Sequence, residues 1–194
     1  MPRPKHIISA VDIGTSSIRA IMGALDDKGN IHVIGFAEKN SENSVIKGEI
    51  VNIEKATDIL FETIQAAENS SSESFDSTNL YVAVTGNHIR GTQSRGTVAI
   101  HSPDRKVMPE DVEEASRIAS SVSIPPEYMV LNSICGNYVL DDIRRTPHPE
   151  GQTANKLEAM SFTIIGNTNC VNSFLTPLRE IGYETPKPIF SGLA

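Results

Sequence analysis

The sequence predicts an α/β fold in which a mixed sheet is interrupted by a small inserted α+β unit. Three observations carry this prediction. Strand patterns joined by short turns open the chain, an amphipathic helix and an apolar strand follow them, and the order of strands and helices starts afresh after Gly86. With 194 residues, the chain is long enough to bury a hydrophobic core of its own.

The first strands are expected at 7–13, 17–25 and 31–38, and they form an antiparallel meander. Between the second and third strands, Asp26 to Asn30 has the composition of a hairpin turn.

A helix is expected from 53 to 68, because apolar residues recur there on one helical face and Asn52 suits the N-cap position. The Ser-rich stretch 69–78 is expected to be a connector, and 80–84 a buried strand. A meander, a helix and a buried strand in this order are typical of the start of a ribonuclease-H-like mixed sheet.

Residues 87–166 are expected to form the insert, with strand, helix, strand and strand in that order. The predicted strands and helix are 92–100, 109–122, 128–140 and 157–166. Residues 167–194 are expected to return to the first sheet through a helix capped by Thr168 and stopped at Gly182. The pattern stops while one face of the first sheet lacks a cover, so the sheet is expected to be incomplete and the chain truncated.

The composition excludes several classes of protein. Lys+Arg 17 against Asp+Glu 24 gives a net charge of −7, which argues against a nucleic-acid-binding face. Cys135 and Cys170 have no metal-ligand or CxxC spacing, so neither a disulfide nor a zinc site is expected. The apolar stretch near the N-terminus is too short for a signal peptide or a membrane span, which predicts a cytoplasmic protein.

The motif at the first turn, Asp12-Ile13-Gly14-Thr15-Ser16-Ser17, suits a polyphosphate ligand. Gly14 permits close approach of the backbone, and the N–H groups from Gly14 to Ser17 are expected to form an anion nest. Thr15, Ser16 and Ser17 add hydroxyl donors. Asp12 would repel a bare phosphate, so the motif predicts Mg²⁺ held near Asp12 through water, and no catalytic residue.

The same motif can also be a polar hairpin without a ligand. The site is not a Walker P-loop, because no GxxxxGK[ST] motif occurs. One feature favours the phosphate site over the bare hairpin. The hairpin opens a meander followed by a helix, which is where actin-like ATPases and sugar kinases place their first phosphate loop.

Further stretches resemble the FtsA family of bacterial cell-division proteins along essentially the whole chain. The matching stretches are VDIGTSSIRAIMG (11–23), KGEIVNIEKA (47–56), LYVAVTGNHIRG (80–91), EDVEEA (110–115) and IGYETPKPIFSGLA (181–194). The resemblance implies an actin-like fold in which residues 1–86 begin subdomain 1A, residues 87–166 form the inserted subdomain 1C, and residues 167–194 return to 1A. It also implies that ATP and Mg²⁺ bind at Asp12, Gly14, Thr15, Ser16 and Ser17.

The resemblance further implies a protein that polymerises and tethers FtsZ filaments to the inner face of the cell membrane at the division site. Self-association and divisome contacts are expected through residues 87–166. The second phosphate loop, the adenosine motif, the FtsZ-binding subdomain and the membrane-binding C-terminal helix of the family have no counterpart here. Many actin-like relatives have an acidic residue near Ser191 that orients the attacking water, so its lack predicts a scaffold and not an enzyme.

Two alternatives remain open from the sequence. A PilM-like pilus assembly protein shares the expected fold and insert. A phosphotransferase of the sugar- or acetate-kinase type would need an acceptor-site base, and no Asp/Arg group between Gly86 and Gly166 suits that role.

Overall fold

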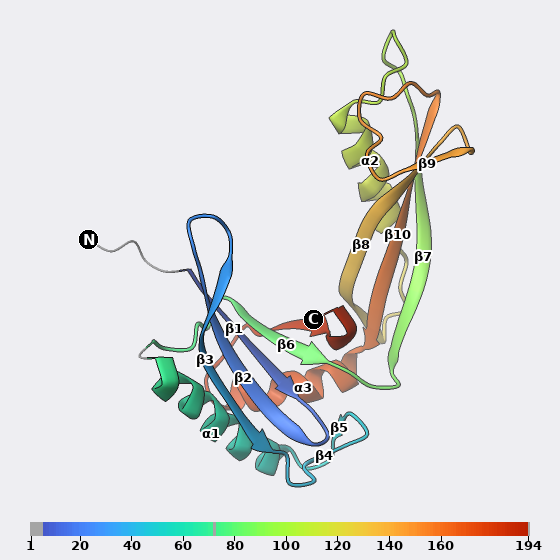
Figure 1. Cartoon of the computed structure of the whole chain (residues 1–194). Coiled ribbons are helices and arrows are strands. Elements are labelled where there is room, and N and C mark those ends of the chain that lie inside the picture. The colour runs from blue at the N-terminus through green and yellow to red at the C-terminus, as the bar shows by residue number, and fades with distance from the viewer. Residues whose placement is uncertain (1–5, 72, 194) are drawn as a thin grey trace. The chain divides into compact units, whose positions relative to one another are not determined.

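The computed structural model describes residues 6–71 and 73–193 (Figure 1). The chain divides into two compact units. The first unit joins Met1–His88 with Asn167–Ala194, and the second is Ile89–Gly166. The second unit therefore begins at Ile89, two residues after the predicted start of the insert at 87. In the part of the chain that the structure describes, no helix is both long and apolar enough to cross a membrane.

The first unit contains the predicted mixed sheet, with strand order β11-β6-β1-β2-β3. β1 pairs antiparallel with β2 and β2 with β3, whereas β1, β6 and β11 run parallel. The strands are β1 (His6–Ile13), β2 (Ser17–Leu25), β3 (Ile31–Asn40), β6 (Leu80–Val84) and β11 (Lys187–Phe190). Two short strands, β4 (Val45–Ile46) and β5 (Glu49–Ile50), form a separate hairpin after β3.

One face of this sheet is covered by the helices α1 (Ile53–Ser71) and α3 (Thr168–Glu180), which also contact each other (Figure 1). Alternate residues of the strands, such as Val11 and Met22, are buried on this face. The residues between them point to the opposite face, where Ile21 and Phe36 lie opposite each other and are exposed. The helices thus complete a hydrophobic core on one side of the sheet only.

Three helix boundaries differ from the sequence prediction, and one cap agrees with it: α2 (Pro109–Ser120) ends two residues before the predicted 122, and the other two differences concern α1 and α3. The Asn52 side chain accepts a hydrogen bond from the N–H of Lys55, as the predicted N-cap should. α1 continues to Ser71, past the predicted end at 68, because Ser70 and Ser71 donate their hydroxyl protons to carbonyls of the preceding turn. α3 is capped by Asn167 and not by Thr168: the Asn167 side chain accepts from two N–H groups of the first turn.

The second unit is a four-stranded antiparallel sheet with one helix on it. Its elements are β7 (Ile89–Ala99), α2 (Pro109–Ser120), β8 (Tyr128–Leu140), β9 (Arg144–Thr146) and β10 (Lys156–Asn167). The strand order is β7-β10-β8-β9. The strand, helix, strand, strand order matches the sequence prediction, and the short β9 is added within the loop between the last two predicted strands.

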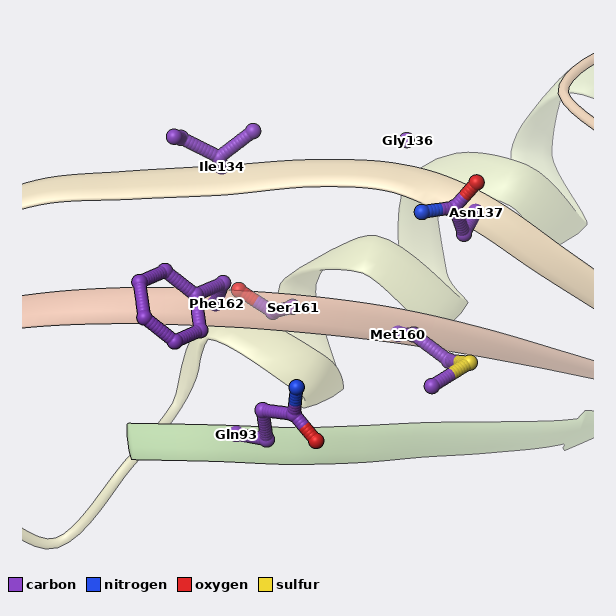
Figure 2. A pocket seen from close by; sticks show the side chains of 7 residues that line it. All are labelled: Gln93, Ile134, Gly136, Asn137, Met160, Ser161 and Phe162. Atoms are coloured by element: carbon purple, nitrogen blue, oxygen red, sulfur yellow. The ribbon is translucent and has the colours of Figure 1, made fainter. Parts of the chain in front are cut away.

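The face of this sheet that does not carry α2 is open and partly apolar. Val130, Ile134 and Phe162 are exposed there although they are large hydrophobic side chains. A hollow of about 280 Å³ lies on the unit, and Figure 2 shows the side chains that line it. Its lining consists of Gln93, Ile134, Gly136, Asn137, Met160, Ser161 and Phe162. No charged side chain lines this hollow, so its chemistry does not suit a phosphate.

The other face depends on a close approach between α2 and β7 at Gly96. A Cβ atom at Gly96 would lie 2.1 Å from the carbonyl oxygen of Ala115 and 2.3 Å from the nitrogen of Ala119. Both atoms belong to the helix backbone, so they cannot move aside as a flexible side chain can. Ser94 strengthens the same contact, because its hydroxyl donates to the carbonyl oxygen of Ala119.

We therefore expect Gly96→Ala to destabilise the protein by about 2–3 kcal/mol, the upper range for overpacking, because α2 must lift off the sheet. The measurement is denaturant unfolding of the variant and the wild type. Gly136→Ala is the matched control: Gly136 is also a strand glycine, and a Cβ there would have no atom within 4 Å. Equal stability of the two variants would contradict the close contact of α2 with Gly96.

Candidate functional site

Three parallel strands of the first unit end at the same edge of the sheet. β1 ends at Ile13, β6 at Val84 and β11 at Phe190, and the register places Phe190 beside Val84. The carboxyl-end edge of a parallel sheet is the usual place for a ligand in an α/β fold. The residues that follow these strands, including Gly14, Thr85 and Ser191, are therefore brought together from three distant parts of the sequence.

The predicted phosphate motif lies at this edge, in the turn between β1 and β2. Ile13 pairs with Ile18, so residues 14–17 form the turn. Thr15 and Ser16 are exposed. A Cβ atom at Gly14 would lie 3.0 Å from the carbonyl oxygen of Ser17, so a larger residue would press on the turn. The turn therefore presents Thr15 and Ser16 to solvent beside the strand end.

Two members of the predicted anion nest have other partners. The N–H of Gly14 donates to the carbonyl oxygen of Ser17, at 2.9 Å, and so closes the hairpin. Ser17 is buried, and its hydroxyl hydrogen-bonds the carboxylate of Glu38; this bond, together with that from Arg19, lowers the pKa of Glu38. These two groups therefore already have hydrogen-bond partners within the chain.

The donors that remain are at Thr15 and Ser16. Within the described residues, no atom accepts a hydrogen bond from the N–H of Thr15 or of Ser16. The hydroxyl oxygen of Thr15 accepts a hydrogen bond from the N–H of Gly48, at 3.0 Å, which leaves the Thr15 hydroxyl proton free to be donated. The turn thus offers unpaired N–H groups and one oriented hydroxyl, all of which suit an anionic oxygen.

Asp12 is the second-last residue of β1, next to this turn, and it pairs with Arg19 of β2. Partial burial raises the pKa of Asp12, and the positive charge of Arg19, 3.5 Å away, acts in the opposite direction. Arg19 also contacts Glu38, at 3.0 Å, so one guanidinium is shared by two carboxylates. Arg19 was not predicted as a site residue, because strands at 7–13 and 17–25 joined by a turn at 14–16 would pair Asp12 with Ile18 and not with Arg19.

The residues present fit a magnesium ion held indirectly. Among the described residues, no group of three or more His, Cys, Asp or Glu side chains is placed to hold a metal ion. Asp12 supplies a carboxylate at the end of β1, beside the turn. Because Mg²⁺ usually keeps several waters and binds through one or two carboxylates plus substrate phosphates, a single Asp beside a phosphate site is sufficient.

The loop that follows β3, residues 41–48, contacts the turn. This contact was not predicted from the sequence. Ser41, which is buried, donates its hydroxyl proton to the carbonyl oxygen of Thr15 and its N–H to that of Ser16. The loop takes a tight course: Glu42, Asn43 and Lys47 all have positive φ although none is a glycine. Lys47 leads into Gly48, which reaches the hydroxyl of Thr15.

Comparison with known proteins identifies relatives of this chain. A family model described as the SHS2 domain inserted in FtsA matches residues 86–165. The cell division protein FtsA of Pseudomonas aeruginosa is 31% identical over 97% of this chain and 44% of its own length. FtsA of Borreliella burgdorferi is 29% identical over 98% of this chain and 45% of its own length. The chain thus spans about half the length of the curated relatives it matches.

A solved structure with a similar fold is the PilM-PilN type IV pilus biogenesis complex. The likeness covers 97% of this chain and 48% of that chain, with a TM-score of 0.56 and 16% sequence identity. At this identity the likeness concerns the fold, which is actin-like, as predicted. The family model and the FtsA relatives bear on the family itself, and they agree with the resemblance found in the sequence. The chain belongs to the FtsA family of cell-division proteins.

Proposed function

We propose that this chain is part of an actin-like, nucleotide-binding scaffold of cell division, and that ATP with Mg²⁺ binds at the β1–β2 turn. One observation carries the proposal: unpaired N–H groups of Thr15 and Ser16 face solvent beside Asp12 at the carboxyl-end edge of the sheet. N–H groups in such a turn attract an anion. The carboxylate of Asp12 favours an anion that arrives with a metal ion.

The balance of interactions predicts weak binding to this chain alone. A few hydrogen bonds to phosphate, each contributing roughly 1.5–3 kcal/mol, must offset at least ~4 kcal/mol of lost translational and rotational freedom. The net charge of −7 also opposes a polyanion. We therefore expect a dissociation constant near 1 mM, which corresponds to about −4.1 kcal/mol.

We also propose that the nucleotide supports assembly and is not turned over. Ser191 follows β11 at the same edge of the sheet, in the short 3-10 turn Ser191–Leu193, and its side chain has no carboxylate to orient a water molecule. Asp12, at the end of β1, is acidic, whereas Ser191, after β11, is not. Its proposed task is to hold the metal.

The proposed partners are FtsZ, other divisome proteins and further copies of the same protein. The proposed location is the inner face of the cell membrane at the division site, reached through a C-terminal helix. Within this chain, the proposed contact surface is the open face of the second unit, because Val130, Ile134 and Phe162 are exposed there. A nucleic-acid partner is not proposed, since the net charge is −7.

For the phosphate site we predict that Asp12→Asn weakens binding of Mg²⁺-ATP but does not weaken binding of ATP without Mg²⁺, because the lost carboxylate serves the metal. Thr15→Ala should weaken both by about tenfold or more, since a hydrogen bond to a charged acceptor contributes roughly 1.5–3 kcal/mol. Amide NMR titration measures these millimolar affinities.

Asp27→Asn is the control for net charge, because Asp27 lies in the turn at the far end of β2. It should leave the affinity for Mg²⁺-ATP unchanged. If Asp12→Asn and Thr15→Ala both bound Mg²⁺-ATP as the wild type does, the β1–β2 turn would not be the phosphate site.

For the contact surface we predict that Ile134→Glu reduces self-association, because it places a charge in an apolar hollow that a partner must desolvate. Sedimentation equilibrium over a range of protein concentrations measures the effect. Ile143→Glu is the matched control: Ile143 is 83% exposed, against 45% for Ile134, and it does not line the hollow. Equal loss in both variants would assign the effect to charge and not to this surface.

A further inference from the structure

The loop after β3 holds two successive carbonyl groups of the β1–β2 turn through one residue. The hydroxyl of Ser41 donates to the carbonyl oxygen of Thr15, and the N–H of Ser41 donates to the carbonyl oxygen of Ser16, at 3.1 Å. Both carbonyls therefore point to the side of the turn where Ser41 lies.

This constraint determines where the next N–H groups point. In a trans peptide the C=O of one residue and the N–H of the next lie in one plane and point in opposite directions. No cis peptide occurs among the described residues. Because Ser41 holds the carbonyls of Thr15 and Ser16, the N–H groups of Ser16 and Ser17 must point away from it.

Ser41 is itself held firmly. It is 1% exposed, and its carbonyl oxygen accepts two hydrogen bonds from Ser44, one from the hydroxyl at 2.6 Å and one from the N–H at 2.8 Å. The same loop returns to the turn at Gly48, whose N–H contacts the Thr15 hydroxyl. The turn is thus fixed at three points by a loop that lies far from it in the sequence.

We infer that Ser41 is a positioning residue of the phosphate site: through the Thr15 carbonyl, it aims the unpaired N–H group of Ser16 at an anionic phosphate oxygen. The inference rests on the proposed function and deepens it, because it assigns a donor and the residue that orients it. Orienting the donor before the ligand arrives lowers the entropy lost on binding. Ser41 does not touch the ligand, and the effect of its side chain on affinity passes through the Thr15–Ser16 peptide group.

The test is an amide NMR titration of this chain with inorganic pyrophosphate and Mg²⁺, in the wild type, in Ser41→Ala and in Ser44→Ala. In the wild type, the amide signal of Ser16 should shift more than that of Thr15, whose preceding carbonyl Ser41 does not hold. Ser41→Ala removes the hydroxyl bond to the Thr15 carbonyl and keeps the backbone bond to the Ser16 carbonyl. It should therefore weaken binding about fivefold or more and reduce the Ser16 shift, as loss of one hydrogen bond implies.

Ser44→Ala is the matched control, because it removes a hydroxyl bond from the same buried loop without removing a bond to the turn. It should lower the melting temperature about as much as Ser41→Ala does while binding pyrophosphate nearly as the wild type does.

Equal weakening in the two variants would show that loop stability alone matters and would overturn the inference. If Thr15 shifted more than Ser16 in the wild type, the inference would also fail, and this readout needs no variant. If pyrophosphate shifted no amide of the hairpin, the proposed phosphate site itself would fail, which is a distinguishable result.

Discussion

The pairing of β1 on both of its edges organises the first unit. β1 is bonded antiparallel to β2 and parallel to β6, so it is a central strand with partners on both sides. The antiparallel pairing closes the turn at Gly14, and the parallel pairing brings the end of β6 to the same edge of the sheet. A strand with a partner on one side only could supply the turn or the shared edge, but not both.

The conformation of the turn depends on a neighbouring loop as much as on its own residues. The hairpin bond from Gly14 fixes where the turn begins, and the bonds from Ser41 and Gly48 fix which way its middle faces. The cost of this arrangement is visible in the loop, where Glu42, Asn43 and Lys47 adopt positive φ. Strain held in this loop is offset by hydrogen bonds that orient the turn.

In both units, only one face of the sheet is covered by helical structure. In the first unit α1 and α3 cover one face, and Ile21 and Phe36 remain exposed on the other. In the second, Gly96 lets α2 approach β7 closely, while Phe162 remains exposed on the opposite face. Apolar side chains on an uncovered sheet face favour a further contact, because burial would remove them from water.

The sequence by itself determined the mixed sheet, the inserted unit and the position of the phosphate motif, because these depend on local periodicity and on turn residues. The hairpin register that places Arg19 opposite Asp12 was not determined by the sequence, because the predicted strands would pair Asp12 with Ile18. The strands β4, β5 and β9 were not determined by it either, because two or three residues show no periodicity. Only the tertiary structure decided which donors remain free: the Gly14 N–H closes the hairpin, Ser17 binds Glu38, and Ser41 reaches the turn from 26 residues away. Such hydrogen bonds depend on distances between segments that are remote in the chain, and no local pattern of residue types encodes those distances.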